Sequence, residues 1–200
     1  MDDLIGELKK YLSTYSKHID NYNLEISIGN SLGKYIFDTH VSNKYWMGIQ
    51  RKLEGGGDYK ARREFTYRIY SLHDMKLYID SSDNKRCVQK ELRGCSHCYN
   101  NTSGFDFKIS MYDRNTYNTA VFPPVHEYNS VVKRHTISYN YNGYYINLSK
   151  NTPIEGGSGQ TFYTITILFS KCKTSKNIYV NNFVNQVSIY PTHPPKLELW

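Results

Sequence analysis

The sequence predicts a mainly β protein, an antiparallel closed barrel that follows an N-terminal helix. Segments in which apolar and polar residues alternate outnumber segments with helical spacing. Glycine and polar clusters separate the alternating segments, as turns separate antiparallel strands. With 200 residues the chain can form one domain with a real core. We therefore expect a single domain, with the helix in residues 1–20 and the barrel in residues 21–200.

The helix is expected between Asp2 and Tyr15. Apolar side chains recur there at the spacing of one helical face, at Leu4, Ile5, Leu8, Tyr11 and Leu12. This pattern predicts one amphipathic helix.

The first strand is expected at residues 23–29, where the periodicity changes from helical to alternating. If this strand lines a barrel, its apolar side chains pack outward and its polar side chains face the interior. The outward set is Leu24, Ile26 and Ile28, and the inward set is Asn23, Glu25 and Ser27.

The same alternation predicts six later strands. They lie at residues 65–70, 76–79, 105–110, 133–139, 144–148 and 162–169. A regular run of half-buried strands with only a helix or two is typical of a closed antiparallel barrel or a sandwich. We favour a barrel of about eight strands, because that number encloses a space for a small ligand.

The charge balance indicates an anionic partner. Lys and Arg number 25 against 18 acidic residues, a formal net charge of +7, so nucleic acid or phosphate is the expected ligand class. No stretch approaches the roughly 18 apolar residues of a membrane span, and the first residues lack the pattern of a signal peptide. We therefore expect an intracellular, cytoplasmic protein, located in the host cytoplasm or virion if it is viral.

A short cysteine motif raises the question of zinc. Cys95 and Cys98 are spaced as two thiolate ligands often are, with His97 between them and Cys87 nearby, but a second closely spaced pair is missing. Ordinary loop thiols are the preferred interpretation. A cysteine nucleophile has even less support, because nothing in the sequence brings a cysteine together with a candidate base among His73, His97 and His126.

One basic cluster differs from the others. Residues 62–63, 85–86 and 90–93 are interpreted as solvated surface, whereas Lys133, Arg134 and His135 lead into an alternating strand. Neighbouring residues of a strand face opposite sides, so Lys133 and Arg134 cannot both point inward without a bulge. We expect Arg134 to point inward, because its planar fork grips phosphate at two points.

The order of these segments resembles the tunnel-fold, metal-dependent RNA 5′-triphosphatases of fungal and large-DNA-virus mRNA capping systems. That family opens with a Glu-x-Glu-x-Arg-x-Gly strand, to which residues 23–29 are similar. Its basic strand and its Ile-Asp-Leu-Thr-like strand are similar to residues 133–139 and 146–150, and its closing Tyr-Glu-x-Glu-x-Glu-like strand to residues 163–168. The resemblance implies a triphosphate tunnel.

The departures from the family pattern concern its metal site. In the family, glutamates of the first and last strands hold a divalent metal, a task that needs oxygen ligands with charge. Of these positions only Glu25 keeps its carboxylate; the neutral replacements are Asn23, Thr164, Thr166 and Leu168. In addition, Ser27 replaces the arginine of the first strand, and Asn147 replaces the aspartate of the Ile-Asp-Leu-Thr-like strand. A lone carboxylate cannot build the usual site, so we expect no cofactor, with Mg²⁺ or Mn²⁺ only if the chain is active.

Three functions remain open at this stage. The leading one is a catalytically degenerate triphosphatase-like domain that binds RNA 5′ ends, polyphosphate or a partner protein, with Lys133, Arg134, His135 and Lys150 as the anion ligands. The second is an active mRNA 5′-triphosphatase, in which Glu25 works with unrecognised acids among Asp106, Asp113 and Glu127. The third is a viral structural or virion-associated protein whose tyrosine-rich surface is an assembly interface.

Overall fold

The computed structural model describes most of the chain between residues 6 and 169. The described residues are 6–7, 9–11, 13–14, 22–33, 36–57, 59–72, 75–99, 105–113, 116–117, 127–128, 130–141, 144–155 and 159–169. The elements in chain order are β1 (Tyr22–Ser31), β2 (Phe37–Asp38), α2 (Asn43–Gly56), β3 (Ala61–Leu72), β4 (Met75–Asp80), β5 (Lys85–Gln89), β6 (Leu92–Cys98), β7 (Asp106–Asp113), β8 (Thr116–Tyr117), β9 (Ser130–Tyr141), β10 (Tyr144–Glu155) and β11 (Phe162–Phe169).

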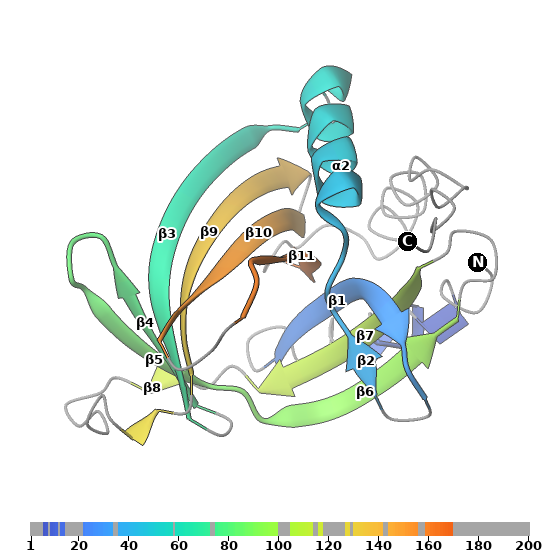
Figure 1. Ribbon diagram of the computed structural model, residues 1–200. Coiled ribbons are helices and arrows are strands. Elements are labelled where there is room, and N and C mark those ends of the chain that lie inside the picture. The colour runs from blue at the N-terminus through green and yellow to red at the C-terminus, as the bar shows by residue number, and fades with distance from the viewer. Residues whose placement is uncertain are drawn as a thin grey trace.

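One antiparallel sheet contains all of these strands. Its order is β6-β7-β1-β11-β10-β9-β3-β4-β5-β8, with β2 paired to β1 off this path. Figure 1 shows β3, β9 and β10 bending together as an arch, with β1, β7 and β6 on the other side of the molecule. The expected mainly β, antiparallel fold is confirmed.

The sheet is curled, and its two ends are joined by the chain rather than by strand pairing. β5 lies near one end and β6 at the other, yet only Lys90 and Glu91 separate them in sequence. β8 begins three residues after β7 ends and again belongs to the opposite end. Within the described strands no pairing joins the two ends, so the expected barrel is not closed by hydrogen bonds.

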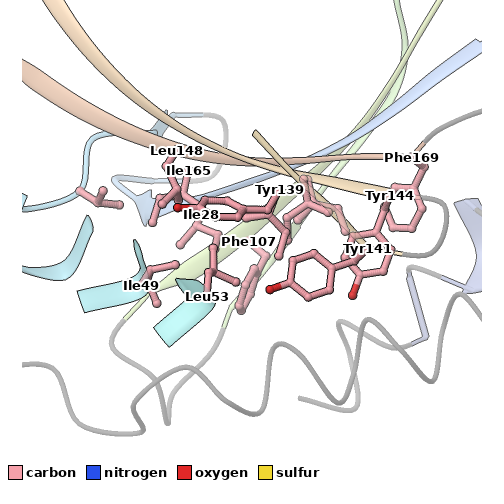
Figure 2. Close-up of a cluster of buried hydrophobic side chains, with 14 of the residues drawn as sticks. Ile28, Ile49, Leu53, Phe107, Tyr139, Tyr141, Tyr144, Leu148, Ile165 and Phe169 are labelled. Carbon is pink, nitrogen blue, oxygen red and sulfur yellow. The ribbon is translucent and has the colours of Figure 1, made fainter. Parts of the chain in front are cut away.

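The outer face of the sheet carries the hydrophobic core. Leu24, Ile26 and Ile28 of β1 are all almost fully buried, as the alternation predicted. They pack in one cluster with residues of β6, β7, β9, β10, β11 and α2. In Figure 2, Ile49 and Leu53 of α2 lie on one side of this cluster, and side chains of the sheet lie on the other.

Helix α2 was missed by the sequence analysis, although its start and end follow ordinary rules. Ser42 caps the first turn by accepting a hydrogen bond from the Tyr45 amide, and Gly57 ends the helix in the left-handed conformation. The helix is joined to the sheet by Tyr139, whose hydroxyl donates to Glu54 at 2.8 Å. Its apolar stripe is short, which explains why the periodicity did not reveal it.

Several strands are longer than expected, and others were not expected at all. β3, β9 and β10 each span 12 residues, whereas the predicted segments covered about half of that. β5 and β6 were interpreted as polar or loop segments; β6 is the strand at one end of the sheet and β5 lies near the other end, where one face can remain exposed. The cysteine motif therefore lies on a strand rather than in a loop.

The expected N-terminal helix is partly described. Gly6, Glu7, Lys9, Lys10, Tyr11, Ser13 and Thr14 are helical, and the other residues of that prediction lie outside the described part of the chain. Tyr11 packs against the core cluster, and the Ser96 hydroxyl of β6 donates to Glu7 at 2.7 Å. Among the described helices, none has the length and apolar content needed to cross a bilayer.

We expect Ile26→Ala to lower the free energy of unfolding by about 2–5 kcal/mol, because Ile26 is fully buried and its truncation leaves a cavity. Ile154→Ala is the matched control, since Ile154 is 46% exposed and the change should cost less than about 0.5 kcal/mol. Urea unfolding of both variants measures the difference. Equal losses would show that the outer face does not carry the core.

Candidate functional site

The face opposite the core is lined by polar side chains, and we call it the inner face. Strand pairing aligns the residues of this face, as in the row Ser27, Thr166, Asn147 and Ser138 across β1, β11, β10 and β9. Its buried polar residues are Ser27, Ser110, Thr136, Ser138, Ser149, Asn151 and Thr164. Hydroxyl and amide groups can donate hydrogen bonds to an anion, so this face suits a charged ligand.

Charged side chains from distant strands meet on the inner face. Glu25 of β1 interacts electrostatically with Lys76 of β4 and Arg134 of β9. Four strands separate β1 from β4 in the sheet order. Side chains from strands so far apart can meet only on the concave side of a curled sheet, so the inner face is the inside of the curl.

Glu25 is the centre of this cluster. The Lys90 ammonium donates to Glu25 Oε2 at 2.8 Å, and the Ser27 hydroxyl donates to Glu25 Oε1 at 3.4 Å. Burial alone would raise the pKa of Glu25, but Lys90, Lys76 and Arg134 together lower it below its ordinary value. Glu25 is therefore ionised at neutral pH and already paired with Lys90.

Lys90 closes the cluster from the link between β5 and β6. Its ammonium lies 4.7 Å from the centroid of the Tyr112 ring, a cation–π distance. Burial would lower the pKa of Lys90, but the charge and hydrogen bond of Glu25 raise it. The side chain remains 38% exposed, so solvent and ligands can reach it. The sequence analysis placed residues 90–93 on the solvated surface, and for Lys90 that was wrong.

Lys76 is a cation without an ion pair among the described residues. Burial lowers its pKa, and repulsion by Arg134 and Lys90 lowers it further, against the attraction of Glu25. Burial therefore destabilises the charged form of Lys76, and no carboxylate among the described residues forms an ion pair with it. An anion beside Lys76 would remove that cost, which is the electrostatic pattern of a binding site.

Arg134 is held in place by a buried amide. Its Nε donates to Asn151 Oδ1 at 2.6 Å, and Asn151 is fully buried. Asn151 Nδ2 in turn donates to Thr164 Oγ1 at 3.4 Å. This chain of contacts uses only one nitrogen of the guanidinium group, and no described carboxylate pairs with the other two. Those two nitrogens are the fork that would grip a phosphate.

The charge balance around Glu25 is positive. Lys76, Lys90 and Arg134 surround the Glu25 carboxylate. Lys108 adds a further half-buried cation, since it pairs with Ser27 in the register of β7 and β1. Lys76 and Lys108 were missed by the sequence analysis. The sequence pattern could have indicated them, because each lysine lies in an alternating segment between two apolar residues and therefore on the face opposite to theirs.

The structure brings the positions of the resemblance together. Glu25 pairs with Leu168, and Ser27 pairs with Thr166, which in turn pairs with Asn147. Alternation places Asn23 and Thr164 on the same inner face. The two strands of the metal motif are therefore neighbours in the sheet.

The four basic residues expected to act together are divided between the two faces. Arg134 is on the inner face, whereas Lys133, His135 and Lys150 are on the outer face by alternation and register. His135 Nε2 lies 3.6 Å from Glu64, and Lys133 and Lys150 are exposed. These three side chains do not line the site around Glu25.

The cysteine motif is also divided. Cys95 faces inward, where the Ser110 hydroxyl lies 4.0 Å from its sulfur, while Cys98 is buried in the core on the outer side. Two thiols on opposite faces of a sheet cannot grip one ion. His97 faces inward near Phe37, with no contact to a cysteine among its described contacts. His73 and His126 lie outside the described residues.

The described residues around Glu25 do not fit a divalent metal. Mg²⁺ and Mn²⁺ need several oxygen ligands with charge, but the inner-face neighbours of Glu25 are Ser110 and Leu168, and one of its oxygens binds Lys90. Asp106 lies opposite Gly29, four residues further along β1, and Asp113 pairs with Arg93 at 2.8 Å. Glu127 is exposed. Within the described part of the chain, no group of three or more His, Cys, Asp or Glu residues could hold an ion.

Solved structures that are similar to this chain include RNA triphosphatases. The chain is similar to the Pct1 RNA triphosphatase of S. pombe, with a TM-score of 0.76 and 14% identity over 96% of this chain and 94% of that one. The same protein in complex with the Spt5 CTD gives a TM-score of 0.74 and 14% identity, covering 96% and 95% of the two chains. The Mimivirus capping-enzyme triphosphatase gives 0.58 and 10% identity, covering 96% and 98%. The chain thus has the tunnel fold of these enzymes.

Comparison by sequence gives no such match. No family model matches the chain. No curated protein matches it either. At the identities found, the structural likeness shows the fold alone.

We expect Lys76→Met to stabilise the protein at neutral pH and low salt. Because the pKa of Lys76 is lowered in the folded state, charging Lys76 destabilises the fold below that pKa, and the cost fades as pH rises toward the pKa of an unfolded lysine. Thermal unfolding should show a melting temperature higher by about 2–4 °C, the shift that about 1 kcal/mol produces in a domain of this size.

Lys133→Met is the control for this change, since Lys133 is exposed on the outer face. It should leave the melting temperature nearly unchanged. The gain from Lys76→Met should shrink as the pH approaches 10.4, where an unfolded lysine loses its proton. A lower melting temperature for Lys76→Met at neutral pH would contradict the electrostatic account.

Proposed function

We propose that this protein binds the 5′-triphosphate end of RNA, or polyphosphate, on its inner face and does not hydrolyse it. The observation that carries the proposal is the excess of positive charge around one carboxylate. Lys76 and Arg134 have no carboxylate of their own among the described residues, because Glu25 is bound to Lys90. A polyanion would supply the missing negative charge.

Phosphate fits this site better than a carboxylate or a halide would. The two nitrogens of Arg134 that no described carboxylate contacts match two oxygens of one phosphate, and Lys76 and Lys90 can reach others as point charges. Thr136 and Ser149, which hydrogen-bond each other at 2.8 Å, add hydroxyl groups to the same face. Since the cations come from β4, β9 and the link after β5, they suit a ligand with several phosphates in a row.

The absence of hydrolysis is proposed from the donor set. The resemblance implies that a metal held by glutamates of the first and last strands does the chemistry. Here Thr164, Thr166 and Leu168 occupy the last-strand positions. The cations of the inner face can neutralise phosphate charge, but a lysine or an arginine does not activate water as a bound metal does.

A protein ligand is a second candidate. The S. pombe enzyme is solved in complex with the Spt5 CTD, so a domain with this fold can bind a protein segment. In this chain such a partner would have the outer face available, where Lys133 and Lys150 are exposed and separate from the inner site.

Arg134→Ala should weaken tripolyphosphate binding about ten-fold or more. The change removes a charge-assisted contact of roughly 1.5–3 kcal/mol. Lys133→Ala is the matched control, because it removes the same charge from the neighbouring residue of the same strand on the opposite face. Calorimetric titration at two salt concentrations should show binding that weakens steeply with salt for the parent and for Lys133→Ala. Equal affinities for all three proteins, or no saturable binding at low salt, would contradict the proposal.

Glu25→Gln should tighten tripolyphosphate binding and leave catalysis absent. The substitution removes the competing negative charge and frees Lys90 for the ligand. The expected gain is several-fold at low salt and smaller at high salt. The same samples, incubated with triphosphate-ended RNA and Mg²⁺ or Mn²⁺, should release no phosphate. Metal-dependent turnover by the unmodified protein that Glu25→Gln abolishes would establish the active enzyme instead.

A further inference from the structure

A short segment crosses the inner face at one end of the strands. The Phe37 ring lies 5.5 Å from the His97 ring, and the His40 ring lies 4.4 Å from the Phe162 ring. His97 is on β6 and Phe162 is on β11, and both point inward by register. β7 and β1 lie between these two strands. Residues 37–40 therefore span four neighbouring strands on the inner side.

Gly29 shows how closely this segment lies against β1. A Cβ atom at Gly29 would point inward and overlap the carbonyl oxygen of Asp38, with the Phe37 ring 2.9 Å away. Only glycine allows the backbone of residues 37–38 to lie so close to the strand. The contact is thus built into the sequence of β1.

The course of the chain shows that this is an end of the curl. After residue 40, Val41 pairs with Tyr163 at the start of β11, and α2 then packs on the outer face. The chain therefore passes from the inner face to the outer face around the ends of the strands. Lys90 lies near the other end of β1, since Tyr112, which it contacts, pairs with Asn23.

We propose that residues 37–40 close one end of the tunnel, so that the site receives the end of an anionic chain and never its middle. This inference rests on the proposed function. The ligand enters at the Lys90 end, meets Glu25, Lys76 and Arg134, and stops before Gly29. Gly29 lies four residues beyond Glu25 on β1, so the ligand has about 13 Å of strand length between these two residues. A triphosphate end fits such a limit, whereas the interior of a polynucleotide or polyphosphate would have to run through.

The distribution of charged side chains also favours entry of the ligand from the Lys90 end. Asp38 lies in the crossing segment, and Asp106 lies opposite Gly29 on β7. Asp106 Oδ2 accepts a hydrogen bond from the Ser31 amide at 3.0 Å, which holds it at this end. The blocked end thus carries carboxylates, while Lys76, Lys90 and Arg134 gather around Glu25 and Lys108 lies between the two groups, opposite Ser27. A polyanion is therefore attracted from the Lys90 end and repelled at the other.

The test is the number of protein molecules that bind one long linear polyphosphate. A tunnel closed at one end can take only the two chain ends, so mass photometry should show at most two copies per polyphosphate at every chain length. A tunnel open at both ends could be threaded repeatedly, and the number of copies would grow with length. The salt concentration is chosen so that the Arg134→Ala variant no longer binds polyphosphate. Because this variant keeps the outer surface unchanged, the remaining binding of the unmodified protein then comes from the inner face.

The double variant Phe37→Gly with His40→Gly gives a second readout, with its melting temperature recorded to show that it folds. Removing both rings should let the number of bound copies exceed two and rise with chain length. More than two copies on the unmodified protein, or an unchanged limit in the folded double variant, would overturn the inference. If tripolyphosphate does not bind at all, the proposed function fails instead, and titration of that short ligand distinguishes the two cases.

Discussion

The ion pair between Glu25 and Lys90 is the interaction on which the inner face depends. Glu25 lies on β1, the third strand from the β6 end of the sheet, and Lys90 lies in the two-residue link that connects β5 to β6. The pair therefore connects β1 with the link between the two ends of the sheet, which no strand pairing joins among the described residues. A partly buried pair of this kind is costly to break, because the remaining charge is left without a partner. It also removes Glu25 as a partner for the other cations.

The excess charge that results is expensive for the fold. Lys76 and Arg134 are held near each other and near Lys90, and the pKa of Lys76 is lowered by burial first and by this repulsion second. A protein retains such groups where they serve binding, since stability and function are often opposed at a site. The buried hydroxyl and amide groups around them offer hydrogen bonds but no negative charge. For these reasons we propose an anion from outside as the ligand of the inner face.

Strand alternation also explains how one basic cluster can serve two different surfaces. Arg134 belongs to the inner face together with Asn151 and Thr164, while Lys133 and His135 belong to the outer face. Closing the inner face at one end separates these surfaces further, because the segment with Phe37 and His40 leads the chain from one to the other. An anion on the inside and a protein on the outside would then bind independently, on opposite sides of the same strands.

The sequence by itself determined the strand class of the chain and the two faces of β1, because a period of two is a local property of the backbone. The same period showed that only one of Lys133 and Arg134 can point inward, and the choice of Arg134 came from the phosphate-binding geometry of its guanidinium group. It could not show α2, whose apolar stripe is short, or β5 and β6, whose polar residues look like loops. Only the tertiary structure decided which inward positions meet. Glu25, Lys76 and Lys90 are far apart in sequence, and the curl of the sheet brings them together. The sequence neighbours Lys133 and Arg134, in contrast, lie on opposite faces of the sheet because side chains alternate along a strand.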